Sequence, residues 1–326
     1  MPRATIDPQI MEQTLTAGLR APSAHNAQPW RLSRVGDGTY LLWYSFADKL
    51  LADPDDRDGI IAVGGFYETL RLAGEARGLR ADFKPGVVGH GAGIELGTVT
   101  FLPLRGDPDP LAAAIDDRQC NRERYATTPL PDDLAAGLQA LGTILLAPQD
   151  VAGLVSRASI LSWGDRRFVT DLETWTRFVD VAPDGMTFDC LRVTRSDAIA
   201  LRVALRLGRL PGWLAWFYAQ RDVHLTRASA SMAILTVESR EPLALFDCGR
   251  RLIRSWTLIN SRGYAWHPMS VVIDQPTVAD LSAVIGGRDP VAIYRVGKAP
   301  RAAAWSQRRA LDDILVPPPS DLVRPR

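Results

Sequence analysis

Residues 20–31 combine stiff and hydrogen-bonding residues at an unusual density. Their sequence, RAPSAHNAQPWR, places a serine, a histidine, an asparagine and a glutamine between two prolines. Proline restricts the backbone, and the side chains of Ser23, Asn26 and Gln28 can either hydrogen-bond a ligand or hold the turn itself. An ordinary loop needs only one or two turn-forming residues, so this pattern predicts a rigid turn that faces a ligand.

Two further segments carry closely spaced arginines. Arg118 and Arg122 lie in RQCNRERY, and Arg308 and Arg309 lie in SQRRALDDIL. A guanidinium group holds phosphate through forked, charge-assisted hydrogen bonds that an ammonium group cannot reproduce. These arginines are therefore candidates for a phosphate site, although each segment taken alone is more typical of a solvated basic surface.

Other kinds of chemistry find little support in the residue pattern. The histidines lack the spacing that would put two metal ligands on one helical face, so we expect no metal site. No Ser/His/Asp or Cys/His arrangement indicates a protein nucleophile. The glycine-rich residues 89–93 precede a strand-like alternation, which favours a hairpin turn over a phosphate loop. His25, inside the proline-rich turn, has two open roles, as a brace for the turn or as a proton donor.

Bulk composition narrows the class of protein. The chain has 326 residues, of which 46% are hydrophobic, and its 38 basic and 37 acidic residues are spread along the sequence. We therefore expect a globular protein with no nucleic-acid partner. Without a signal-type apolar segment or a run long enough to span a bilayer, we also expect a cytoplasmic protein with no membrane association. Three cysteines without a CxxC pair are expected to be reduced, with at least two of them in the core.

Hydrophobic periodicity places the turn and the arginines between regular elements. A helix begins near Asp7 and Pro8 and is ended by Pro22. The following expected elements are strands at 30–35 and 39–45, a buried helix ending at Gly78, a hairpin around 89–93, helices from 111 to about 225, a strand at 231–239, a buried helix from 246, a strand at 291–297 and a proline-rich tail.

One internal similarity connects the two ends of the chain. A leucine-rich helix with a glycine near each end occurs twice, with Gly65 and Gly78 13 residues apart and Gly249 and Gly263 14 residues apart. A duplicated module explains this similarity simply, and a chance match of two buried helices is the alternative.

Taken together, the three chemical segments resemble the FMN-dependent nitroreductase superfamily, and specifically its long, Acg-like branch. The proline-rich turn matches the signature AxxAPSxxNxQPW at Ala21, Pro22, Ser23, Asn26, Gln28, Pro29 and Trp30. RQCNRERY is similar to the RxSxR segment of the family, with Cys120 or Asn121 where a serine or threonine is usual. SRGYAWHPMS is similar to the P-x-x-G stretch beside the flavin ring, and SQRRALDDIL is similar to the last arginine segment.

The resemblance implies an α+β nitroreductase fold made of two fused modules, with central antiparallel or mixed sheets flanked by helices. Residues 1–110 would supply the turn. Residues 111–326 would supply the phosphate site and a possible lid at about 155–225, with Trp213, Trp216 and Phe217 over the flavin. The order of the motifs indicates an internal pseudo-dimer holding one FMN, either as a monomer or as a homodimer.

The implied activity is ping-pong transfer of a hydride or electrons. NADH or NADPH would reduce FMN at N5, and a small oxidised acceptor would then be reduced. The alternatives are a flavin-sequestering or stress-related protein with little turnover, and a flavin dehydrogenase or oxidase acting on a biosynthetic intermediate.

The same resemblance implies the residues of the site, with no catalytic side chain. The backbone of Ser270 and Val271 would lie near N5, where the family usually has an acidic residue or a glycine. Family spacing favours Arg308 for the phosphate, with Arg309 as the substitute. The cofactor-binding residues implied are Arg20, Pro22, Ser23, Asn26, Gln28, Arg118, Arg122, Pro268, Met269, Ser270, Arg308 and Arg309.

Overall fold

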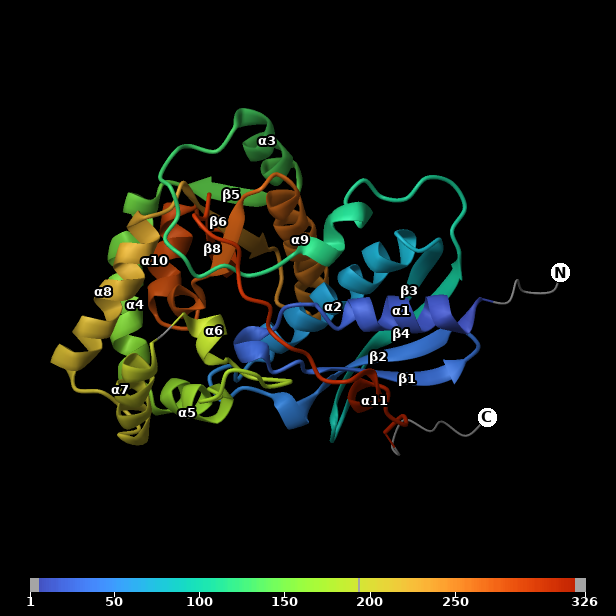
Figure 1. Ribbon diagram of the computed structural model, residues 1–326, viewed down its shortest axis with the longest axis horizontal. Coiled ribbons are helices and arrows are strands. Elements are labelled where there is room, and N and C mark those ends of the chain that lie inside the picture. Colours follow the sequence, from blue (N-terminus) through green and yellow to red (C-terminus); the bar gives the residue numbers. More distant parts are fainter. Residues whose placement is uncertain (1–5, 193, 320–326) are drawn as a thin grey trace.

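Two four-stranded antiparallel sheets form the framework of the chain. The computed structural model describes residues 6–192 and 194–319 (Figure 1). The first sheet has the order β1-β2-β4-β3 and the second has the order β5-β6-β8-β7. The strands are β1 (Trp30–Gly36), β2 (Thr39–Ser45), β3 (Leu79–His90), β4 (Gly93–Pro103), β5 (Thr143–Leu146), β6 (Ser231–Val237), β7 (Ala265–Pro268) and β8 (Asp289–Gly297).

Helices cover both sheets and fill the space between them, which completes the expected α+β fold. The end of the proline-rich tail, residues 320–326, lies outside the described residues. The helices are α1 (Pro8–Gly18), α2 (Arg57–Glu75), α3 (Asp132–Ala140), α4 (Pro148–Gly164), α5 (Arg166–Trp175), α6 (Phe188–Leu191), α7 (Arg195–Arg206), α8 (Gly212–Arg227), α9 (Pro242–Ser261), α10 (Thr277–Val284) and α11 (Leu311–Ile314). None of the described helices is long and apolar enough to cross a membrane.

The two sheets repeat one topology. Each has its first two strands as neighbours, then a long helix, and then two strands that pair with each other, with the last strand in the interior of the sheet. The long helix is α2 in the first half and α9 in the second, and these are the two glycine-bounded helices that resemble each other in sequence. A shared strand order is harder to reach by chance than two similar helices, and it favours duplication.

Helices α2 and α9 cross at the centre of the molecule, where glycine permits a close backbone approach. A Cβ atom built on Gly64 would lie 2.0 Å from the carbonyl oxygen of Phe246. One built on Gly249 would lie 2.1 Å from the carbonyl oxygen of Ile61. Neither position can carry a side chain unless the helices move apart. Of the glycines in the sequence repeat, Gly249 is therefore explained by the contact between the two halves, whereas Gly78 and Gly263 have no neighbour within 4 Å of an added Cβ.

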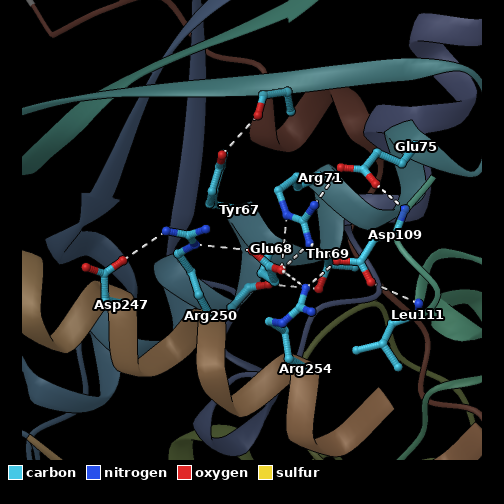
Figure 2. Close-up of polar contacts among 12 residues, drawn as sticks. Tyr67, Glu68, Thr69, Arg71, Glu75, Asp109, Leu111, Asp247, Arg250 and Arg254 are labelled. Atoms are coloured by element: carbon cyan, nitrogen blue, oxygen red, sulfur yellow. Dashed lines mark hydrogen bonds and ion pairs between the residues drawn. The ribbon is translucent and has the colours of Figure 1, made fainter. Parts of the chain in front are cut away.

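A buried ion cluster also joins α2 to α9. Glu68 of α2 is fully buried, and its carboxylate contacts Arg71 on its own helix and Arg250 and Arg254 on α9 (Figure 2). Arg71 and Arg254 also reach Asp109. Burial alone would raise the pKa of Glu68, but the hydrogen bond and charge of Arg71 and the charges of Arg250 and Arg254 lower it below its usual value. Glu68 therefore stays ionised inside the contact.

The C-terminal segment returns from the second half to the first. After β8 the chain passes the cavity described below and reaches α11, beside β1 (red in Figure 1). Leu315 forms a parallel bridge with Leu32 of β1, and Val316 donates a backbone hydrogen bond to the same residue. Segments from both ends of the sequence thus lie side by side.

Two expectations about individual side chains are wrong. Of the three cysteines, only Cys248 is a buried core residue, because Cys120 and Cys190 line the cavity and are partly accessible. Trp213, Trp216 and Phe217 do not cover the cavity: they lie on α8, are 73%, 54% and 67% exposed, and are absent from the cavity lining. The buried face of α8 is its small and aliphatic one, so these rings point to solvent.

Candidate functional site

A cavity of about 720 Å³ lies between the two halves. This volume is in the range that holds a cofactor-sized molecule. Its walls come from the proline-rich turn, the face of α2 around Ile61, residues 116–122, residues 186–192, the end of β7 and residues 303–311. The turn and the arginine segments singled out in the sequence therefore meet at one place.

The proline-rich turn has a backbone that few residue types adopt. His25, Asn26 and Gln28 have φ values of 53°, 58° and 55°, in the left-handed region. Asn and His tolerate this region better than most non-glycine residues, although it still costs free energy. Ser23 offsets part of this cost, since its hydroxyl oxygen accepts a hydrogen bond from the backbone of Gln28 at 2.9 Å. Trp30, fully buried and stacked on Phe66, holds the end of the turn against α2.

The amides of the turn connect it to two distant segments. Asn26 donates from Nδ2 to the carbonyl oxygens of Gly185 and Gln307, at 3.1 and 3.3 Å. Gln28 donates to the carbonyl of Pro183 and accepts from the backbone of Arg309. Of the two roles left open by the sequence, Gln28 locks the turn, because it is fully buried and lies outside the cavity lining. Asn26 does the same with its nitrogen while lining the cavity, where its Oδ1 has no partner among the described residues.

Three arginines from three segments converge at one end of the cavity. Arg118 and Arg308 both donate hydrogen bonds to the carbonyl oxygen of Arg20, and Arg308 also donates to that of Ala21. Among the described residues no carboxylate lies within 4.0 Å of these three guanidinium groups, and the Nε atoms of Arg20 and Arg118 have no partner. The cluster therefore concentrates positive charge without a carboxylate at ion-pair distance, although the charges of Asp116 and Asp117 act on Arg20 from farther away.

The electrostatics of this cluster favour an anion. Burial, followed by the charges of Arg308 and Arg20, lowers the pKa of the Arg118 guanidinium to about 9. Burial and the charge of Arg20 lower the pKa of Arg308 to about 10. Like charges held together away from water are costly, and a bound dianion would remove that cost. Two tryptophans of the cavity wall lie against the cluster: the Arg20 guanidinium lies 3.6 Å from the ring centre of Trp305, and that of Arg118 lies 4.6 Å from the ring centre of Trp256.

The neighbouring arginines have different partners. Arg309 lines the cavity, but its guanidinium is ion-paired with Asp48 at 2.9 Å and Asp184 at 3.0 Å, so its charge already has carboxylate partners. Arg122 also lines the cavity and donates from Nη1 to the carbonyl oxygen and the sulfur of Cys190, each at 2.9 Å. Burial opposes ionisation of this thiol, but the charge of Arg122 lowers the pKa of Cys190 below its usual value.

The stretch after β7 is divided between the cavity and the core. Pro268 and Ser270 line the cavity. Met269 does not, because its side chain is 4% exposed within the core of the second half and its backbone N–H is bonded to Ile293. Val271 packs against the same core. Pro22, Ser23 and the arginines Arg20, Arg118, Arg122, Arg308 and Arg309 complete the sequence-predicted residues that the cavity brings together.

Several cavity residues carry no signal that sequence reasoning could have used. Asp58 lines the cavity, and its carboxylate is held by Arg57 at 2.8 Å. Trp256 and Trp305 are recognisable only from their contacts with the arginines. From the expected lid at 155–225, the cavity lining includes residues 186, 189, 190 and 192, on and around α6. His25 lines the cavity as well, with its Nδ1 unpartnered among the described residues.

Comparison with known proteins shows which proteins this chain is similar to. No protein-family model matches the chain. The chain is 28% identical to Rv3131 of Mycobacterium tuberculosis H37Rv, which is named as an NAD(P)H nitroreductase, over 98% of this chain and 94% of that protein. It is 25% identical to PigM of a Serratia species, named likewise, over 94% and 93%, and 23% identical to the M. tuberculosis protein acg over 96% and 97%.

A solved structure agrees with these relatives. The crystal structure of a nitroreductase-type protein from Anabaena variabilis superposes with a TM-score of 0.50 at 10% sequence identity, covering 91% of this chain and 90% of that one. This likeness shows the nitroreductase fold. Relatives of nearly equal length match along the whole chain and the fold agrees, so the chain is similar to the long nitroreductase-type proteins that acg represents.

Proposed function

We propose that this chain is an FMN-binding oxidoreductase that uses NADH or NADPH to reduce a small oxidised acceptor. The observation that carries the proposal is the cluster of Arg20, Arg118 and Arg308, which lines a cavity of about 720 Å³ and has no carboxylate partner within ion-pair distance among the described residues. A phosphate dianion matches three converging guanidinium groups in charge and in hydrogen-bond geometry. Relatives named NAD(P)H nitroreductase along the full length support the same reading.

The remaining walls of the cavity fit a flat ligand with one apolar and one polar end. Pro22 offers apolar contact, and the turn behind it is held rigid by Ser23, Asn26 and Gln28. Arg122 and the backbone of Ser270 and Val271 would serve the polar end. Rigid donors of this kind stabilise developing negative charge without having to reorganise.

In this proposal the protein orients and the cofactor reacts. FMN, when bound, supplies a site that accepts a hydride from a nicotinamide and passes it to an oxidised acceptor. The turn at 20–31 comes from the first half, residues 1–110. The second half, residues 111–326, supplies Arg118, Arg122 and Arg308. We propose that the two halves form one composite site in an internal pseudo-dimer.

A visible absorption spectrum and an FMN titration of the apoprotein test the binding step. We expect either a yellow preparation or saturable binding of added FMN. A colourless protein that also fails to bind FMN would contradict the proposal.

Stopped-flow mixing with NADH and NADPH tests the reaction. We expect one of them to bleach bound FMN much faster than it bleaches free FMN. If bound FMN is reduced no faster than free FMN, the chain holds flavin without turning it over, and the oxidoreductase reading is overturned while binding stands.

A further inference from the structure

A histidine that sequence reasoning left without a role lies on the cavity wall. His267 belongs to β7, directly before Pro268, and its cross-strand partner on β8 is Arg295. Arg295 is fully buried and donates from Nε to Nδ1 of His267 at 2.9 Å. It is held in place by a bond from Nη1 to the carbonyl of Glu123 and by the ring of Tyr125, whose centre lies 4.0 Å from the guanidinium.

This contact decides which imidazole nitrogen carries the proton. A guanidinium group has only donors, so Nδ1 of His267 must act as the acceptor and cannot carry a hydrogen. The single proton of the neutral ring is therefore on Nε2. Among the described residues Nε2 has no hydrogen-bond partner, and the ring is partly accessible because it borders the cavity.

The surroundings keep this imidazole neutral. Burial, followed by the charges of Arg295, Arg122 and Arg221, lowers the pKa of His267 well below its usual value. These groups approach from β8, from the segment after Arg118 and from α8, and no carboxylate of the described residues forms an ion pair with the ring. A second proton would also place an N–H against the N–H of Arg295. The ring thus remains a donor that does not titrate at neutral pH.

His267 lies apart in sequence and contacts from the phosphate cluster. It directly precedes Pro268 and Ser270, which line the cavity where we propose that the polar end of the ring is bound, whereas Arg118 and Arg308 meet at the carbonyl oxygen of Arg20. In an FMN molecule the ribityl hydroxyls near the phosphate and the carbonyl oxygens and nitrogens of the pyrimidine edge accept hydrogen bonds, while the dimethylbenzene end has no acceptor. A fixed donor next to Pro268 and Ser270 therefore matches the pyrimidine edge.

We infer that His267 binds the pyrimidine edge of the flavin through a permanent Nε2–H donor, and that Arg295 is the residue that positions it. This inference rests on the proposed FMN-binding function. The acceptor atoms of that edge become more negative on reduction, so a fixed donor stabilises the reduced cofactor more than the oxidised one. His267 therefore raises the reduction potential of bound FMN.

Two substitutions separate the donor from the structural contact. His267→Asn keeps an oxygen where Nδ1 accepts from Arg295 but removes the donor to the cavity, whereas His267→Gln keeps an N–H near the position of Nε2. We expect His267→Asn to weaken FMN binding about fivefold to tenfold, the effect of one lost neutral hydrogen bond, and to lower the midpoint potential. His267→Gln should stay close to the wild type in both. Equal affinity and potential in His267→Asn and the wild type would overturn the inference.

Nitrogen NMR of the histidine-labelled wild-type protein tests the same inference without a substitution. We expect His267 to remain the neutral Nε2–H form between about pH 5 and pH 8, and its Nε2 signal to shift when FMN is added. In Arg295→Met we expect the pKa of His267 to rise, because one neighbouring positive charge is removed, while burial keeps it below its ordinary value. A wild-type Nε2 signal that does not respond to FMN would overturn the inference, whereas a wild-type protein that binds no FMN would overturn the proposed function itself.

Discussion

At the scale of single residues, the arginines that line the cavity differ in whether a carboxylate lies within ion-pair distance. Arg308 and Arg309 are adjacent in sequence, yet only Arg309 finds carboxylates, at Asp48 and Asp184. Arg308 joins Arg20 and Arg118, where nothing of opposite sign lies within ion-pair distance in the described part of the chain. Adjacent arginines thus differ in their partners: Arg309 is paired with carboxylates of the fold, and Arg308 is the one that we propose binds an anion.

This difference predicts opposite outcomes for two matched substitutions. Arg308→Ala should weaken FMN binding about 10- to 100-fold, because charge-assisted hydrogen bonds to phosphate are lost. Arg309→Ala should change FMN affinity less than threefold but lower the free energy of unfolding by about 1–3 kcal/mol, because Asp184 and Asp48 lose a buried partner. Fluorescence titration and urea unfolding measure the two effects. An Arg309→Ala protein with the larger loss of FMN affinity would exchange the assignments.

Asp53 predicts a dependence of stability on pH. Burial and then the charge of Asp58 raise the pKa of Asp53 to about 7 in the folded protein, while its carboxyl oxygen accepts from the backbone of Gly59 at 3.0 Å. In the unfolded chain it titrates near 4, so between about pH 4 and pH 7 the folded state binds more protons and loses stability as the pH rises.

The variant Asp53→Asn removes this titration while keeping an oxygen for the bond from Gly59. When the pH rises from 4.5 to 8, we expect the free energy of unfolding of the wild type to fall by on the order of 2–4 kcal/mol more than that of Asp53→Asn. Urea unfolding at the two pH values gives the difference. If wild type and variant change in parallel, Asp53 is ionised in the folded protein at both pH values and the expected cause is wrong.

At the scale of elements, the crossing of α2 and α9 fixes how the two halves meet. Gly64 and Gly249 bring the backbones into contact, and Glu68 binds two arginines of the opposite helix a turn further along. The cavity begins on the same face of α2, at Ile61 and Gly65. A change in the crossing therefore moves one wall of the cavity relative to the others.

Gly64→Ala tests this element. The added Cβ would lie 2.0 Å from a backbone carbonyl that cannot rotate away, so we expect the variant to lose about 2–3 kcal/mol or more of unfolding free energy. The matched control is Gly153→Ala in α4, where nothing lies within 4 Å of the added atom. That variant should gain about 0.5–1 kcal/mol from improved helix propensity. Thermal unfolding measures the stability of both variants. A Gly64→Ala protein that is as stable as Gly153→Ala would contradict the close crossing of the helices.

The local residue pattern was enough to predict part of this architecture. The turn at 20–31 was recognisable because its residue types are improbable together, and the strands β1, β2, β6 and β8 because apolar residues alternate or run together in them. The short strands β5 and β7, with four residues each, carry too little periodicity. The sequence could not predict which side chains pair with each other. The contacts of Arg309 with Asp48 and of Arg295 with His267 join segments that only folding brings together. The prediction that the tryptophans of α8 cover the cavity was wrong because aromatic content does not reveal which face of a helix is buried.

At the scale of the whole molecule, one composite cavity accompanies two similar halves. The proline-rich turn and the arginine segments each occur once in the sequence, although the sheet topology occurs twice. Titration of the apoprotein should therefore saturate at one FMN per chain. At a free FMN concentration 100 times the dissociation constant, binding should add about 2.7 kcal/mol to the free energy of unfolding. Calorimetric titration together with thermal unfolding measures both, and saturation at two FMN per chain would contradict a single composite site.

The return of the C-terminal segment to β1 has a consequence for biosynthesis. The turn at 20–31 is synthesised well before residues 303–311, which contribute Arg308 and the ring of Trp305. The end of the cavity where Arg20, Arg118 and Arg308 meet is therefore incomplete in the nascent chain until translation has passed residue 311. A chain that stops before residue 303 contains the strands of both sheets but lacks part of the proposed anion site.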